Sequence, residues 1–312
     1  EIANGDWSSD VCSSDLAKGT YLGDTSLISA ISLSAGVNLY GGFAGTESSL
    51  DERSPKTNVT IIDGRYKRRC IIQNYDFADS LAIVVDGFTI QNGYLQNNSG
   101  VNVKSKKNTT FNNCIFRNAR TGNEGVYAER SIFRNCQFIE NKIQDLEIYG
   151  GVVDSCSFSD NTTTQSNKIV YLNGSRMSNS QICGITNEYG IIDAVENSVI
   201  SYCKIMNNKI RYYNTVYLSN STLENSLVCG NEIYNSGYSY SIISADYTSF
   251  ITNSTIAHNK TRNSSAVSCN SSSPNKYTTI ANSIIYGNKV TDVVLPQVVV
   301  SDCLKVKYCA SD

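Results

Sequence analysis

The apolar residues of this chain come in groups of three or four, each bounded by Asn, Ser, Gly or Asp. The stretch from Thr215 to Asn231 shows the pattern, with apolar groups at 215–218, 221–223 and 226–228. The bounding residues are turn formers, and groups this short suit strands. No period contains the 3.6-residue apolar spacing of a helix. The pattern therefore predicts three short strands for every repeat of the chain.

The third group of each repeat carries the clearest motif: a small residue, any residue, an apolar residue, two more residues and then Asn. Three strands per period predict an all-β fold, a single-stranded right-handed parallel β-helix of about ten coils, with the hand taken from the bias of parallel crossovers. A leucine-rich repeat would need a return segment, and a propeller would need a period near forty. The motif begins at Cys136, Cys156, Cys203, Ser226, Ser254 and Ser283, with degenerate copies at Cys114 and Ser180.

The asparagines that end the motif occupy the same place in successive coils. We expect them to stack along one edge, where their amides can bond the local turn and the amide of the next coil. Asn also tolerates left-handed backbone angles at a tight turn. A row that binds ice or glycan is the functional alternative to this structural ladder. The predicted ladder comprises Asn141, Asn161, Asn208, Asn231, Asn259 and Asn288.

Cysteines share the small-residue position at 114, 136, 156 and 203. Adjacent strands are about 4.8 Å apart, whereas disulfide-bonded Cβ atoms are nearer 3.8 Å, so we expect buried free thiols there. Cys303 and Cys309 lie near the end and could be joined to staple a cap. The chain has a single histidine and no CxxC pair, so we expect no metal site and no cofactor.

Residues 6–16 resemble the conceptual translation of a sequencing-library adapter. We therefore expect residues 1–16 to lie outside the fold and 17–312 to form the β-helix, with capping coils at 17–64 and a truncated C-terminal end.

Charged residues make up only 17% of the chain and the net charge is −2, which argues against nucleic acid as a partner. No run of eighteen apolar residues occurs, so we expect no transmembrane helix, and we expect a monomer.

Acidic residues do not share one offset from the repeat motif, so no catalytic residue is assigned. Asp145 with Glu147, and Asp193 with Glu196, remain candidate pairs for a hydrolase. A lyase would need a Lys or Arg base and clustered carboxylates for calcium. His258 is interpreted as a turn residue.

Tyrosines gather in the loops that follow the ladder asparagines, and these loops should emerge on one edge. Tyrosine suits recognition surfaces because its ring supplies contact area and its hydroxyl a hydrogen bond. The sequence therefore predicts a glycan-binding strip, and the alternative is that the rings only cover the coil corner. The predicted binding residues are Tyr189, Tyr212, Tyr213, Tyr234 and Tyr238.

Two segments resemble known families. Residues 36–47, 50–53 and 60–64 are similar to the N-terminal signature of secreted β-helix proteins of Bacteroidetes-type bacteria. The units 138–141 and 158–161 resemble the Phe-x-x-Asn repeat of polymorphic outer-membrane proteins.

The resemblance implies a secreted or cell-surface, adhesin-like scaffold that binds a polysaccharide or cell-surface glycan. The chain departs from it in that most coils lack paired glycines and no C-terminal sorting domain is visible. A polysaccharide lyase or glycoside hydrolase of the pectate-lyase-like β-helix class is the alternative.

Overall fold

The structure, a computed structural model, describes residues 12–24, 26–94, 103–120, 124–163, 168–234, 239–269, 276–291 and 303–311. They form a right-handed parallel β-helix of about 11 turns, which confirms the predicted fold class. The chain divides into two compact units, 1–152 and 153–312, which are described separately.

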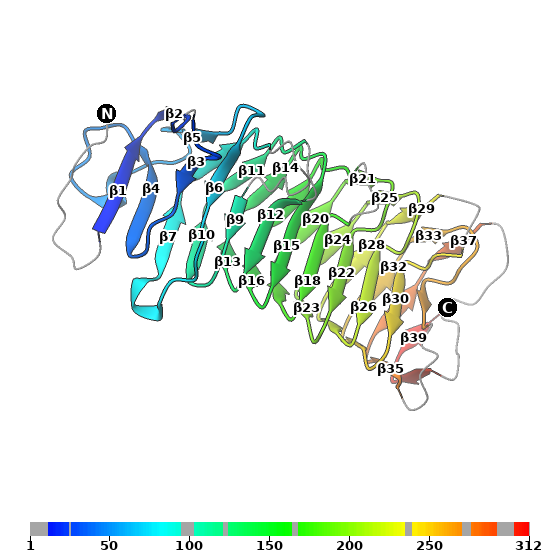
Figure 1. Cartoon of the computed structure of the whole chain (residues 1–312). Coiled ribbons are helices and arrows are strands. Elements are labelled where there is room, and N and C mark those ends of the chain that lie inside the picture. The colour runs from blue at the N-terminus through cyan, green and yellow to red at the C-terminus, as the bar shows by residue number, and fades with distance from the viewer. Residues whose placement is uncertain are drawn as a thin grey trace. The chain divides into compact units, whose positions relative to one another are not determined.

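Unit 1 winds through three parallel sheets, and strands of one sheet come from successive turns (Figure 1). The connections also contain the 3-10 helices η1 (Leu50–Glu52) and η2 (Asp79–Leu81). Sheet A contains β1 (Cys12–Ala17), β4 (Val37–Phe43), β7 (Ile83–Asp86), β10 (Thr109–Asn112) and β13 (Ile132–Arg134). Sheet B contains β2 (Gly19–Tyr21), β5 (Thr60–Asp63), β8 (Phe88–Gln91), β11 (Ile115–Arg117) and β14 (Gln137–Ile139). Sheet C contains β3 (Ser29–Ser32), β6 (Arg69–Ile72), β9 (Val103–Ser105), β12 (Glu124–Glu129) and β15 (Gln144–Tyr149).

Unit 2 repeats this winding and adds a fourth sheet. Its part of sheet A contains β16 (Val152–Asp154), β19 (Arg176–Ser178), β23 (Val199–Ser201), β27 (Thr222–Glu224), β31 (Phe250–Thr252), β35 (Thr278–Ala281) and β38 (Leu304–Lys307). Its part of sheet B contains β17 (Ser157–Ser159), β20 (Gln181–Cys183), β24 (Lys204–Met206), β28 (Leu227–Cys229), β32 (Thr255–Ala257), β36 (Ile284–Tyr286) and β39 (Ala310–Ser311). Its part of sheet C contains β18 (Val170–Asn173), β22 (Ile192–Val195), β26 (Val216–Ser219), β30 (Ile243–Asp246) and β34 (Val267–Ser268).

The fourth sheet corrects the expectation of three strands per coil. Sheet D is built from two-residue strands directly after the ladder position, in segments that the sequence analysis assigned to loops. Ile210 and Ile233 are buried there, so their side chains bind these segments to the core. The strands are β21 (Thr186–Asn187), β25 (Lys209–Ile210), β29 (Glu232–Ile233), β33 (Lys260–Thr261) and β37 (Lys289–Val290).

Inward side chains stack on equivalent side chains of the next turn because parallel strands pair in register. In unit 1, Phe111 of β10 pairs with Phe133 of β13, and their rings stack with centroids 5.0 Å apart. Phe116 and Phe138 stack in the same way at 4.8 Å. Each such ring pair contributes about 0.5–1.5 kcal/mol beyond its buried area. The core is thus a set of columns, one for each inward position.

The corners of the coil correct one part of the ladder interpretation. The left-handed backbone angles occur one residue before the ladder asparagines, for example at Asn207 (φ 54°), Gly230 (φ 68°) and His258 (φ 54°). The ladder asparagines themselves point inward and are buried. Tolerance of left-handed angles therefore explains the corner residues and does not explain the ladder. His258 is an exposed turn residue, as predicted.

The small residue that opens each motif has a hydrogen-bonding role that serine and cysteine share. The Ser226 hydroxyl donates to the Glu224 carbonyl (2.7 Å) and accepts the backbone N–H of Cys203 (3.0 Å). The Cys203 thiol likewise donates to the Ser201 carbonyl (3.2 Å). The prediction of buried free thiols is confirmed for Cys114, Cys136, Cys156 and Cys203.

The possible staple between Cys303 and Cys309 is not formed. Cys303 forms a disulfide with Cys269, with Cα atoms 6.2 Å apart. Cys303 immediately precedes β38, and this position places Cys303 against the preceding turn. The Cys309 thiol instead donates a hydrogen bond to the Lys307 carbonyl. The bond thus joins residues 34 positions apart, a pairing that no local spacing indicates.

Strand β1 lies mostly within residues 1–16. It pairs in parallel with β4, and Leu16 is buried. This pairing describes the geometry of the segment and says nothing of its origin, so the adapter interpretation stays a prediction, as does the capping role of 17–64.

Candidate functional site

The ladder asparagines lie inside the coil and form a continuous chain of amides in unit 2. The Asn208 amide nitrogen donates to Asn231 Oδ1 (2.9 Å), that of Asn231 to Asn259 Oδ1 (2.9 Å), and that of Asn259 to Asn288 Oδ1 (2.8 Å). In unit 1, Asn141 Oδ1 accepts the backbone N–H of Ala119. Asn161 is also buried. Because these side chains are covered, the row presents no surface for ice or glycan.

Three of the predicted tyrosines come together on unit 2. Tyr189 lies 5.8 Å from Tyr212 and 5.6 Å from Tyr213, measured between ring centroids, and Tyr213 lies 5.3 Å from Tyr240. We call these four residues the tyrosine surface. Tyr234 is exposed and has no part in these ring contacts, and Tyr238 lies outside the described residues.

Hydrogen bonds hold the backbone under the tyrosine surface against the coil. The Asn187 amide donates to the carbonyls of Tyr189 (2.6 Å) and Gly190 (3.1 Å), and the Tyr212 N–H donates to the Glu188 carbonyl (2.6 Å). A Cβ on Gly190 would lie 2.3 Å from the Asn214 carbonyl oxygen, so only glycine allows this close approach. The loops that carry the rings are therefore held in place before any ligand arrives.

Lys168 joins the tyrosine surface to the outer face of sheet C. Its ammonium lies 3.9 Å from the centroid of the Tyr213 ring and 4.0 Å from Asp193 Oδ1. Its side chain is only 12% exposed and that of Asp193 is 23% exposed. Burial lowers the pKa of Lys168, while Asp193 opposes this change. Burial raises the pKa of Asp193 to about 6, against the opposing effect of Lys168.

Tyr217 and Asp246 extend the polar group. Tyr217 pairs with Asp193 on the neighbouring strand, since β22 and β26 are in register, and its hydroxyl donates to Asp246 Oδ2 (3.1 Å). Burial, with the nearby Asp246 carboxylate, raises the pKa of Tyr217 to about 12, so the hydroxyl stays protonated at neutral pH. Figure 1 shows β22, β26 and β30 side by side, the strands that carry these three residues.

Sequence reasoning missed this polar group and proposed other acid pairs. Asp145 is buried while Glu147 lies on the outer face, so the two do not form an accessible pair. Glu196 lies in a corner turn, and Asp193 contacts Lys168 instead. One signal in the sequence could have indicated the group. The strands of sheet C carry an outward polar or tyrosine residue at the same position in successive turns: Tyr171, Asp193 and Tyr217.

Metal ligands are not gathered in the part of the chain that the structure describes, where no group of three His, Cys, Asp or Glu residues could hold an ion. Within the same residues, no helix has the length and apolar character needed to cross a membrane.

No protein-family model matches the sequence. No curated protein matches it either.

The chain is similar to several solved structures. The tailspike protein of E. coli bacteriophage HK620, solved in complex with a pentasaccharide, is 13% identical with a TM-score of 0.41, over 95% of this chain and 60% of the tailspike. A mannuronic acid specific polysaccharide family 6 lyase from human gut microbiota is 10% identical with a TM-score of 0.47, over 94% of this chain and 77% of the lyase. Pectate lyase Pel9A is 9% identical with a TM-score of 0.43, over 94% and 80% of the two chains.

This chain thus spans about 60% of the tailspike's length. With identities this low, its function has to be inferred from its own residues.

Proposed function

We propose that unit 2 binds a carbohydrate on the tyrosine surface and the adjoining polar group of sheet C. The observation that carries the proposal is the contact between ring and charge: Tyr213, 40% exposed, lies between Tyr189, Tyr240 and the Lys168 ammonium. Exposed aromatic rings stack on the apolar faces of sugars, and the carboxylate and hydroxyl groups beside them bond sugar hydroxyls.

The backbone of Tyr213 supports the proposal. Its φ of 68° is left-handed, which is unfavourable for a bulky residue. Strained residues of this kind are enriched at binding sites, where the surrounding structure holds them in place. With this backbone conformation, the Tyr213 ring lies against the Lys168 ammonium.

The test uses a panel of neutral and uronate-containing polysaccharides in affinity electrophoresis. Replacing Tyr213 or Tyr189 with Ala should weaken binding roughly tenfold, about 1.4 kcal/mol, because a stacking ring is lost. Tyr202→Ala is the matched control, since Tyr202 is 62% exposed in the same unit and also has a left-handed backbone. Binding that is unchanged in the Tyr189 and Tyr213 variants would refute the site.

We also propose that the protein acts as an exported or cell-surface, adhesin-like scaffold. The support is the resemblance of residues 36–64 to secreted β-helix proteins. Intact cells that produce the protein should lose it on protease treatment, while a cytoplasmic marker survives. Protection equal to that of the marker would contradict this location.

A second candidate function is the cleavage of an acidic polysaccharide, and the contact between Lys168 and Asp193 favours it. An amine with a lowered pKa can take the proton from the carbon next to a uronate carboxylate. The bond from the neighbouring carbon to the glycosidic oxygen then breaks, a carbon–carbon double bond forms, and the leaving oxygen takes a proton. Asp193, protonated below about pH 6, is close enough to take part in proton transfer.

This candidate makes a separate prediction. Incubation with uronate polysaccharides, with and without calcium, should release unsaturated ends, and Lys168→Met should abolish the release while leaving the tyrosine surface in place. If no polysaccharide of the panel yields unsaturated or reducing ends, the result counts heavily against cleavage.

A further inference from the structure

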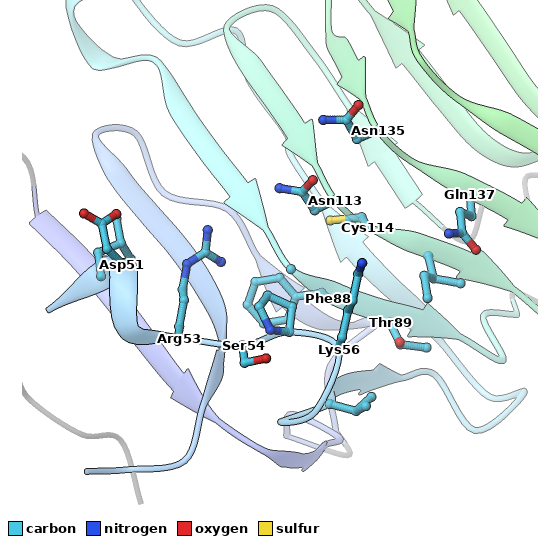
Figure 2. A pocket seen from close by; sticks show the side chains of 15 residues that line it. Asp51, Arg53, Ser54, Lys56, Phe88, Thr89, Asn113, Cys114, Asn135 and Gln137 are labelled. Carbon is cyan, nitrogen blue, oxygen red and sulfur yellow. The ribbon is translucent and has the colours of Figure 1, made fainter. Parts of the chain in front are cut away.

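Unit 1 contains a pocket of about 820 Å³ that is lined by residues of this unit alone (Figure 2). One wall is the segment that follows η1, from Arg53 to Val59. The opposite side is formed by the corners and outer strands of later turns, with Asn113, Asn135 and Gln137. A volume of this size is typical of a small-ligand site.

The wall is fixed by Arg53 and does not depend on a ligand. The Arg53 guanidinium contacts Asp86 Oδ1 at 3.1 Å, donates to the Gly41 carbonyl (3.1 Å) and lies over the Tyr40 ring. Gly87 has a φ of 83°, and a Cβ there would lie 2.8 Å from the Pro55 ring, so glycine lets the wall pack against the coil. The pocket is therefore preformed, and its arginine is already paired.

Three side-chain amides line the opposite side. Asn113 and Asn135 occupy equivalent left-handed corners, with φ of 51° and 52°, and Gln137 is exposed on β14. Figure 2 shows the two asparagine amides projecting the same way from the corners of neighbouring turns. The Asn113 nitrogen donates to Asp86 Oδ1, while Asn135 and Gln137 have no side-chain hydrogen bond to another described residue. Amides placed like this offer both donors and acceptors to a ligand.

Lys56 supplies the charge. It is exposed, has no ion pair with any described residue, and in Figure 2 its ammonium points toward the strand edge that carries Asn113 and Cys114. Asp51, the other lining charge without an ion pair in the described residues, lies beyond Arg53 in the same view. The part of the pocket between Lys56 and the amides is therefore positive. Val59 and Ile115 are among the apolar residues that line the pocket.

We propose that this pocket binds a sugar acid, a monosaccharide unit that carries one carboxylate. The Lys56 ammonium pairs with the carboxylate, the amides of Asn113, Asn135 and Gln137 bond the hydroxyls, and Ile115 and Val59 contact the ring carbons. A single free cation beside several amides matches one negative charge on a hydroxyl-rich ligand. The site belongs to unit 1 and does not depend on the tyrosine surface.

The experiment measures binding of glucuronate, with glucose and the methyl ester of glucuronate as uncharged probes, by ligand-observed NMR titration. Glucuronate should bind, binding should weaken as salt is added, and the uncharged probes should bind at least fivefold more weakly. Lys56→Gln should weaken glucuronate binding about fivefold to tenfold, and Gln137→Ala should weaken all three probes.

Lys67→Gln is the matched control, because Lys67 is an exposed lysine of the same unit outside the pocket. Tyr213→Ala should leave glucuronate binding unchanged, which separates this site from the proposed surface in unit 2. The proposal is overturned if glucuronate does not bind, if Lys56→Gln binds it as well as Lys67→Gln does, or if the methyl ester binds as tightly as the acid. Thermal unfolding confirms that each variant is folded.

Discussion

Corner residues show how backbone conformation selects side chains in this coil. Left-handed angles cost a non-glycine residue roughly 1–2 kcal/mol, and asparagine adopts them more readily than other residues. Asn179, Tyr202, Asn225, Asn253 and Asn282 hold the equivalent corner of successive turns, all with positive φ, and four of the five are asparagine. Tyrosine departs from this preference at several positions, among them Tyr202 and Tyr213.

Asp145 is a buried acid with an expected effect on stability. Burial raises its pKa well above the usual value, and the Asn141 amide opposes the shift without making a hydrogen bond to either carboxylate oxygen. Because the folded pKa exceeds the unfolded one, the stabilising contribution is complete below about pH 4 and is lost as pH rises through the folded pKa.

Replacing Asp145 with Asn should therefore raise the free energy of unfolding relative to the parent, and the gain should grow from pH 4 to pH 7. Urea denaturation of both proteins across that range measures it. A gain that is the same at both pH values would show that Asp145 does not titrate in this way.

Lys168 is expected to control the ionisation of Asp193. The cation opposes the effect of burial, so Lys168→Met should raise the pKa of Asp193 above about 6. Carboxyl carbon NMR, with Asp193→Asn to assign the signal, measures the change. Lys204→Met, which removes an exposed lysine of β24, should leave the signal at its original pKa. A matching shift in both variants would argue for a general charge effect.

At the scale of elements, the strands are held together by the backbone and by polar side chains inside the corners. Asn231 Oδ1 accepts both the N–H and the side-chain amide of Asn208, and its own amide donates to the Ile205 carbonyl and to Asn259. Asn208, Asn231 and Asn259 each bond the turn before and the turn after in this way. A strand of three residues has few backbone hydrogen bonds of its own, so these side-chain hydrogen bonds add to its stability.

Asn231→Ala should lower the free energy of unfolding by about 2–4 kcal/mol, because several buried donors and acceptors lose their partner at once. Asn225→Ala, at a corner with positive φ, should cost only about 1 kcal/mol. Chemical denaturation compares the two. Equal losses would mean that the ladder contributes no more than a corner does.

At the scale of the whole molecule, a covalent bond joins turns that the hydrogen-bonded ladder already connects. The disulfide from Cys269 to Cys303 closes a loop 34 residues long, which stabilises a fold by about 3–4 kcal/mol in the chain-entropy account.

Cys303→Ser should therefore lower stability by that amount and free Cys269 for alkylation, while Cys309→Ser should leave the bond intact. Mass spectrometry after alkylation without reductant reports the pairing, and thermal unfolding reports the loss. A Cys303–Cys309 bond in the parent protein would contradict the structure.

The sequence by itself determined the β-helix, three of the strands in each repeat and the row of buried thiols that form no disulfide. The motif recurs along the chain, and each full copy carries the same local information: a small residue, an inward apolar residue and an Asn. The loops around Tyr189 and Tyr213 could also be predicted, because they interrupt that repeat.

The tertiary structure alone decided which residues of different turns meet. Lys168 and Asp193, Tyr217 and Asp246, and Cys269 and Cys303 are 25 to 34 residues apart and follow no common spacing. The loops differ in length from turn to turn, so the sequence separation between residues that meet on neighbouring turns also differs. For that reason the strands of sheet D, the polar group beside the tyrosine surface and the Lys56 pocket emerged only once the coils were stacked.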